Sequence, residues 1–160
     1  MRKISLTAML LLLAFIGFAQ EPKENGIIYI THPYIDAVNK ATKAYLEKDA
    51  AADRQLYADT AEFWASGMDK PVKLEEAIKM WVSDFDFYDD IKITTVGYPD
   101  YLHYKDKDQK YVQSWGVWSG KSKKTGNVVK IDFIQLDKFN DAGKIEFESV
   151  YGDFSKMVKE

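Results

Sequence analysis

The chain contains no cysteine and only two histidines among its 160 residues. The lack of cysteine excludes disulfides, thiol nucleophiles, thiolate metal sites and lipid attachment to a thiol. His32 and His103 are far apart in the sequence and share no carboxylate spacing typical of a metal motif. We therefore expect no metal and no cofactor. Nine Phe, ten Tyr and four Trp supply large apolar side chains, so packing must stabilise the fold.

Arginine is almost as scarce as cysteine. Only Arg2 and Arg54 occur, the other basic residues are lysines, and the formal net charge is −3. Nucleic-acid and phosphate sites favour the guanidinium fork on a basic face, so we expect no nucleic-acid partner. The sequence also lacks a glycine-rich phosphate loop, a GxSxG turn and a nucleophile with an evident base.

The first nineteen residues have the pattern of a signal peptide. Arg2 and Lys3 precede an apolar run, Leu6–Phe18, and Ala19 ends a small-residue cleavage site. The run is shorter than the roughly 20 residues that span a bilayer, although an uncleaved anchor is the alternative. We predict cleavage after Ala19 and an exported protein, periplasmic or secreted. Loss of Arg2 and Lys3 would bring the net charge to −5.

The remaining chain divides into an N-terminal arm, residues 20–32, and one domain, residues 33–160. Periodicity predicts three helices, with apolar residues at helical spacing in the first and third. It then predicts a short strand between the second and third helices and four long strands after the third. The helices are expected at Pro33–Lys48, Ala50–Ala58 and from Pro71 to about Asp89. The strands are expected at Glu62–Ser66, Ile91–Tyr104, Lys110–Lys121, Asn127–Phe139 and Lys144–Phe154.

This order predicts an α+β domain in which a curved antiparallel sheet wraps around three N-terminal helices. A sheet of such long strands must coil, and coiling around a helix produces a cone with an open mouth.

Two segments, KDAAADRQLYADTAEF at Lys48–Phe63 and KFNDAGKIEFESVYGD at Lys138–Asp153, carry a resemblance within this element order. The chain resembles the nuclear transport factor 2-like superfamily, and within it the small SnoaL-like proteins, over Pro33–Phe154. The resemblance implies the cone and, because relatives often pair through the convex sheet, a homodimer. It leaves the chemistry open, because this fold hosts isomerases, dehydratases, cyclases and binding modules.

Turn positions predict the strand register and therefore which side chains share a face. A two-residue turn at Thr125-Gly126 would place Trp118 opposite Phe133 and Gly116 opposite Gln135. A turn at Asn140–Gly143 would place Gln135 opposite Glu148. One face then collects Trp118, Gly116, Phe133, Gln135, Val150 and Glu148, and the resemblance implies that this concave face lines a pocket. The other face collects Val117, Ile134, Leu136, Phe147 and Tyr151.

From these faces we predict ligand-binding residues, with aromatic rings as walls and Gln135 and Glu148 as polar groups. The set is Trp64, Trp81, Trp118, Phe133, Gln135 and Glu148. The catalytic candidates are Glu148, whose pKa burial would raise, and His103, expected near the mouth of the cone. Gln135 could donate to an oxyanion or a carbonyl. The alternative is that Gln135 and Glu148 point into solvent.

Comparison with ketosteroid isomerases argues against their chemistry. The resemblance aligns their general-base aspartate with Ala65, their oxyanion tyrosine with Ala41 and their oxyanion aspartate with Gln135. In SnoaL-type cyclases an aspartate and a histidine serve the reaction, and His103 with Asp132 or Asp137 could substitute. Asp132, however, has convex parity.

We therefore expect an exported domain that binds a small apolar or aromatic molecule and has no assigned catalysis. One alternative is a SnoaL-like, cofactor-independent enzyme that transfers protons in a cyclisation, dehydration or isomerisation. Another is a protein-interaction module. A buried carboxyl group in the pocket would favour the enzyme, and a pocket filled by its own aromatic side chains would favour the interaction module.

Overall fold

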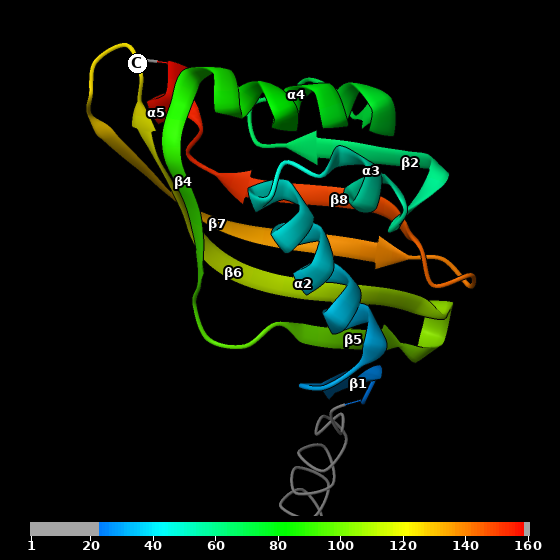
Figure 1. The fold of residues 1–160 in the computed structure, drawn as a ribbon. Helices are drawn as coiled ribbons and strands as arrows, with labels where there is room; N and C mark the ends of the chain where they lie inside the picture. Colours follow the sequence, from blue (N-terminus) through cyan, green and yellow to red (C-terminus); the bar gives the residue numbers. More distant parts are fainter. Residues whose placement is uncertain (1–22, 159–160) are drawn as a thin grey trace, which may run out of the picture.

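A computed structural model describes residues 23–158; the predicted signal peptide lies outside the described residues. Figure 1 shows a curved sheet with helices α2, α3 and α4 on one side of it. The helices are α2 (Pro33–Leu46), α3 (Ala50–Arg54), α4 (Leu74–Phe87) and α5 (Ser155–Val158), with a 3₁₀ turn η1 (Lys105–Lys107). The strands are β1 (Gly26–Tyr29), β2 (Tyr57–Ala65), β3 (Val72–Lys73), β4 (Tyr88–Thr95), β5 (Asp100–Tyr104), β6 (Gln109–Ser122), β7 (Val128–Phe139) and β8 (Ile145–Gly152).

The predicted α+β architecture is confirmed, with one difference in the sheet. The strand order is β1-β5-β6-β7-β8-β2-β3, and β4 also pairs with β6. The neighbours along β5-β6-β7-β8 are antiparallel, as predicted, but β2 pairs with β8 in parallel. The sheet is therefore mixed. None of the helices within residues 23–158 has the length and hydropathy needed to cross a bilayer.

The helices begin and end near the predicted positions, with local corrections. His32 caps α2, because its Nδ1 accepts a hydrogen bond from the Tyr34 backbone N–H at 3.2 Å. Asp49 caps α3 and accepts a hydrogen bond from the Ala52 N–H at 2.9 Å. However, α3 ends at Arg54 instead of Ala58, and the chain enters β2 at Tyr57.

The long strand predicted over residues 91–104 is in fact two strands. β4 and β5 both pair with β6, and the segment Val96–Pro99 separates them. Gly97, in this segment, has a φ of 71°, a conformation that glycine adopts without strain. The break lets this edge of the sheet turn around the helices.

Both predicted hairpin registers are wrong by two residues, but the predicted faces are right. Trp118 pairs with Ile131 instead of Phe133, and Glu148 pairs with Asp137 instead of Gln135. The first turn is longer than two residues, because the last pair before it is Lys121 with Val128, and a bulge at Lys138/Phe139 shifts the second hairpin. A shift of two residues keeps every side chain on its face.

One end of the cone is closed by apolar packing. Tyr34 of α2 lies parallel to Phe139 of β7, with ring centroids 4.3 Å apart, and Tyr101 meets the Tyr34 ring edge-on. The core cluster at this end consists of Ile35, Val38, Tyr57, Ala61, Leu74, Tyr101, Val112, Phe139 and Ile145. Side chains thus fill this part of the concave face.

Candidate functional site

The other end of the concave face encloses an open cavity of about 560 Å³. Its walls come from α2, α3, α4 and the concave faces of β2, β6, β7 and β8, and residues of α5 close one side. The rings that line it are Tyr45, Tyr57, Phe63, Trp81, Trp118, Phe133 and Phe154, and its carboxyl groups are Asp53, Asp84 and Glu148. A volume of this size accommodates a small molecule.

Close packing within the sheet positions one aromatic wall. Gly116 of β6 lies opposite Phe133 of β7, and a Cβ at Gly116 would come within 2.7 Å of the Phe133 ring. The absence of a side chain at Gly116 therefore lets the ring of Phe133 lie across the neighbouring strand, where it lines the cavity.

Glu148 and Tyr57 form a buried pair on β8 and β2. The Tyr57 hydroxyl donates a hydrogen bond to Oε2 of Glu148, and both side chains are almost completely buried. Burial raises the pKa of Glu148 well above its usual range, and the nearby Asp137 and Asp53 carboxyls raise it further, against the opposing effect of the Tyr57 bond. Glu148 is therefore a carboxyl group whose protonated form is favoured more strongly than in an exposed glutamate.

Asp53 reaches the same cavity from α3. Only 5% of the residue is exposed, and its carboxyl makes no hydrogen bond or ion pair within the described part of the chain. Burial raises its pKa to about 7. Its charge also raises the pKa of Glu148 and of Asp137, which shows that the three groups influence one another.

A hydrogen-bonded chain of side chains forms a second polar wall. Trp118 Nε1 donates to the Tyr45 hydroxyl at 2.9 Å, and that hydroxyl donates to Oδ2 of Asp84 at 2.9 Å. Burial raises the pKa of Asp84 to about 6, although the Tyr45 bond acts in the opposite direction. This chain fixes the orientation of the Trp118 and Tyr45 rings.

Gln135 lies between the cavity and the fully buried Asp137. Its Nε2 donates to both oxygens of Asp137, each at 3.1 Å, so the amide oxygen is the part of Gln135 left for another partner. Burial raises the pKa of Asp137 despite these bonds. The predicted role of Gln135 as a donor to an oxyanion is thus in competition with Asp137.

The structure brings five of the six predicted ligand-binding residues together around the cavity. These are Trp81, Trp118, Phe133, Gln135 and Glu148, and Val150 lies beside them. Trp64 does not line the cavity: its ring packs 5.3 Å from that of Tyr151 on the convex face, and its Nε1 donates to the Met68 carbonyl. The reason is strand parity, because Phe63 and Ala65, the neighbours of Trp64 on β2, face inward.

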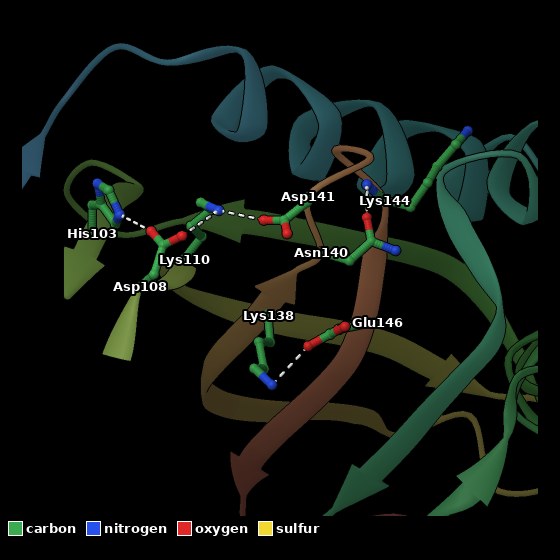
Figure 2. A network of polar contacts seen from close by, with 8 residues as sticks. All are labelled: His103, Asp108, Lys110, Lys138, Asn140, Asp141, Lys144 and Glu146. Atoms are coloured by element: carbon green, nitrogen blue, oxygen red, sulfur yellow. Dashed lines mark hydrogen bonds and ion pairs between the residues drawn. The ribbon is translucent and has the colours of Figure 1, made fainter. Parts of the chain in front are cut away.

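His103 has the predicted concave parity but lies at the closed end, not at the mouth. Figure 2 shows its ring beside η1, with Nε2 2.5 Å from Oδ1 of Asp108. Lys110 continues this network to Asp141 at 2.6 Å, all on the surface. His103 is therefore far from Glu148 in the sheet and does not form a catalytic pair with Asp137 in the core.

The three positions that align with ketosteroid isomerase groups, Ala41, Ala65 and Gln135, all line the cavity. The acids of this chain occupy other positions, at Asp53, Asp84 and Glu148. Sequence reasoning missed Asp53, Asp84 and Tyr57. An acid at helical spacing from inward apolar residues was the available signal: Asp53 precedes Leu56 by three positions, and Asp84 follows Trp81 by three.

No cluster of metal-ligating side chains occurs in residues 23–158. The sequence matches no family model and no functionally curated protein.

Comparison with solved structures identifies the fold. IdmH, a proposed polyketide cyclase from Streptomyces antibioticus, has a TM-score of 0.64 and 20% identity, over 80% of this chain and 97% of that one. A proposed SnoaL-like polyketide cyclase from Shewanella denitrificans has a TM-score of 0.59 and 11% identity, over 81% and 96%. A ketosteroid isomerase-like protein from Catenulispora acidiphila, in complex with trimethylamine, has a TM-score of 0.58 and 16% identity, over 76% and 86%. The chain thus has the nuclear transport factor 2-like fold of SnoaL-like proteins, as its sequence predicts.

Proposed function

We propose that the cavity binds a small, largely apolar molecule and that Glu148 transfers a proton to or from it without a cofactor. The observation that carries this proposal is a buried carboxyl group with a raised pKa, held by Tyr57, on an open cavity lined with aromatic rings. A general acid or base works best when its pKa lies near the working pH. The cavity is also not filled by its own aromatic side chains, which favours a ligand site over an interaction module.

The fold gives this proposal support of a general kind. Structural neighbours include proposed polyketide cyclases, and one neighbour was crystallised in complex with trimethylamine. Proton transfer is therefore a reasonable chemistry for this aromatic-lined cavity, and the residues that would perform it are this chain's own.

The test is an exchange assay that needs no knowledge of the natural substrate. A panel of small aromatic and alicyclic ketones is incubated with the protein in D₂O, and loss of α-protons is followed by NMR. We expect accelerated exchange with at least one ketone, reduced by about 10²-fold or more in Glu148→Gln, which keeps the shape but cannot transfer the proton. Glu76→Gln, on the exposed face of α4, should exchange like the wild type. Ketones that bind without any exchange would leave a binding protein and contradict the catalytic role.

We further propose that two chains pair through the convex face. The predicted apolar set lies on that side of the sheet, with Ile134 and Tyr151 38% and 46% exposed, and a dimer covering about 800 Å² per chain would bury it. Ile134→Lys should give monomers in analytical ultracentrifugation, and Ile27→Lys, on β1 at a similar exposure of 42% but with the parity of His103, should not. A wild-type protein that is monomeric at micromolar concentration would contradict the pairing.

Export remains the proposal that the N-terminal pattern supports. Intact-mass measurement on protein from its native host should show a chain that begins at Gln20. Retention of residues 1–19 would indicate an anchor instead.

A further inference from the structure

All the charged side chains that line the cavity are acidic, and the proposed proton transfer does not by itself require this. Asp53, Asp84 and Glu148 line it from three different elements, whereas its lining contains no lysine, arginine or histidine. Lys48, which follows α2 and is exposed, lines an adjoining surface hollow that Asp53 also borders, but it does not line this cavity. An anionic ligand would find no counter-charge in this cavity.

Asp53 is the carboxyl group of the three that lacks a partner. Glu148 accepts from Tyr57 and Asp84 accepts from Tyr45, but the side chain of Asp53 has neither a hydrogen bond nor an ion pair in the described chain. No fully buried side-chain oxygen or nitrogen in the described residues lacks a partner, so the Asp53 oxygens reach the cavity space. A carboxylate that is largely removed from water still costs folding free energy. A group from outside the chain that paired with Asp53 would remove this cost.

The rings beside Asp53 suit a positive charge. Tyr45 and Trp81 line the cavity together with Asp53 and also line the adjoining hollow. Trp118, which donates a hydrogen bond to Tyr45, lines the cavity beside them. Aromatic faces attract ammonium groups, most strongly where water is excluded. At the edge of this same region the chain itself does this, because Nζ of Lys48 lies 4.6 Å from the centre of the Phe85 ring.

We infer that the ligand of this cavity is a small organic cation, an amine or quaternary ammonium compound, whose charged group pairs with Asp53 among these rings. The inference rests on the proposed ligand binding and narrows it to one substrate class. In this arrangement Asp53 of α3 holds the positive group, while Glu148 of β8, which also lines the cavity, remains available for proton transfer. The apolar remainder of the ligand packs against Phe63, Phe133 and Val150.

Cation binding must then depend on pH. The titratable groups that face the cavity or lie directly behind its wall are Asp53 of α3, Asp84 of α4, Glu148 of β8, Asp137 of β7, Tyr57 of β2 and Tyr45 of α2. Lys48 borders the adjoining hollow beside Asp53, where its Nζ lies over the Phe85 ring. A cation pairs with a carboxylate and not with a neutral carboxyl group. Affinity should therefore rise with pH through the range in which Asp53 and its neighbours lose their protons, and binding should release protons to the buffer.

The test uses three probes of similar shape and different charge. At pH 7.5, 1-naphthylmethylamine is a cation, 1-naphthalenemethanol is its neutral isostere, and 1-naphthoate is an anion. Isothermal titration calorimetry with the full chain should give an affinity for the amine at least 10-fold above that for the alcohol, and the naphthoate should bind more weakly than either. Lowering the pH to 5.5 should reduce the affinity for the amine and change the affinity for the alcohol by no more than about twofold.

Substitutions of the cavity carboxyl groups test whether the cationic group of the ligand pairs with Asp53. Asp53→Asn should lower amine affinity about 10-fold and leave alcohol affinity within twofold, and Glu76→Gln, which removes an exposed carboxylate from α4, should change neither. Asp84→Asn provides a second cavity variant if Asp53→Asn does not fold, and it should reduce the preference for the amine. An alcohol that binds as tightly as the amine would overturn the cation inference and leave the ligand site standing. Failure of all three probes at millimolar concentration would overturn the ligand site itself.

Discussion

The two ends of the cone use the same curved sheet for opposite purposes. At the closed end, Phe139, Val112 and Ile145 pack against α2, and the charged groups lie outside on the surface in pairs. At the open end the concave face is left unfilled, and carboxyl groups lie inside it without a basic partner. Apolar packing is thus concentrated at the closed end, and the buried acids of the cavity lie where the concave face is open.

The acids show the same contrast. The His103 ring and the Lys110 ammonium lower the pKa of Asp108 on the exposed surface (Figure 2), whereas burial raises the pKa of Asp53 at the cavity to about 7. A carboxylate that is buried in this way lowers the stability of the fold. Groups with such raised pKa values cluster at functional sites. The closed end has none of this kind among its described surface pairs.

The largest expected effect comes from removing a ring at the closed end. Phe139→Ala should reduce the free energy of unfolding by about 3–5 kcal/mol, because the ring is 3% exposed and stacks on Tyr34. Phe133→Ala, at the cavity, should cost no more than about 1.5 kcal/mol, because one side of its ring already faces open space. Urea denaturation of the two variants measures the difference. Equal losses would mean that the two ends do not differ in packing.

Next in size is the effect of pH on Asp53→Asn. An acid whose pKa is higher in the folded than in the unfolded chain stabilises the fold while protonated, and this contribution disappears as pH rises through the folded-state value. For Asp53 the window runs from its ordinary value of 3.8 to about 7. The asparagine variant should match the wild type near pH 4 and exceed its stability by about 1–3 kcal/mol at pH 8, a range reduced for the water that the open cavity admits. Denaturation curves at several pH values measure this; a constant difference would contradict it.

The smallest effect is expected from the surface pairs of the closed end. Asp108→Asn removes the partner of His103 and one partner of Lys110, but all these groups reach solvent. Exposed ion pairs contribute little, so the unfolding midpoint should stay within experimental error at low and at high salt. A clear drop in the midpoint, lost at high salt, would show that this network stabilises the fold.

The sequence predicted the faces of the sheet better than its pairing. Alternation along the strands predicts that Trp118, Phe133 and Glu148 share one face, and a shift of two residues does not alter that. The family resemblance, not the alternation, identifies this face as the concave one. Turn length and the bulge at Lys138/Phe139 depend on packing across the sheet, so local residues could not fix the register. The alternation of side chains predicts which face of the sheet a residue lies on, but not which end of the cone it is near. For this reason the sequence predicts the face of His103 but not its place at the closed end.

The sequence did not predict Tyr57 and Asp53 at the cavity, because their positions depend on where α3 ends and on how β2 pairs. Tyr57 was predicted in a helix, and its hydroxyl became a partner of Glu148 only because α3 ends at Arg54 and β2 runs parallel to β8. That pairing joins residues 91 positions apart, which no periodicity indicates. Asp53, on a helix of five residues, looked like an ordinary surface acid.

The proposed function depends most on raised pKa values of the carboxyl groups at the open end of the cone. Carbon-13 NMR titration of the side-chain carboxyls, assigned with Asp53→Asn and Glu148→Gln, tests it directly. We predict that the Asp53 resonance titrates near pH 7 and that the Glu148 resonance titrates well above the ordinary glutamate value of about 4.5. Midpoints below pH 5 for both Asp53 and Glu148 would contradict the proposed acid–base site.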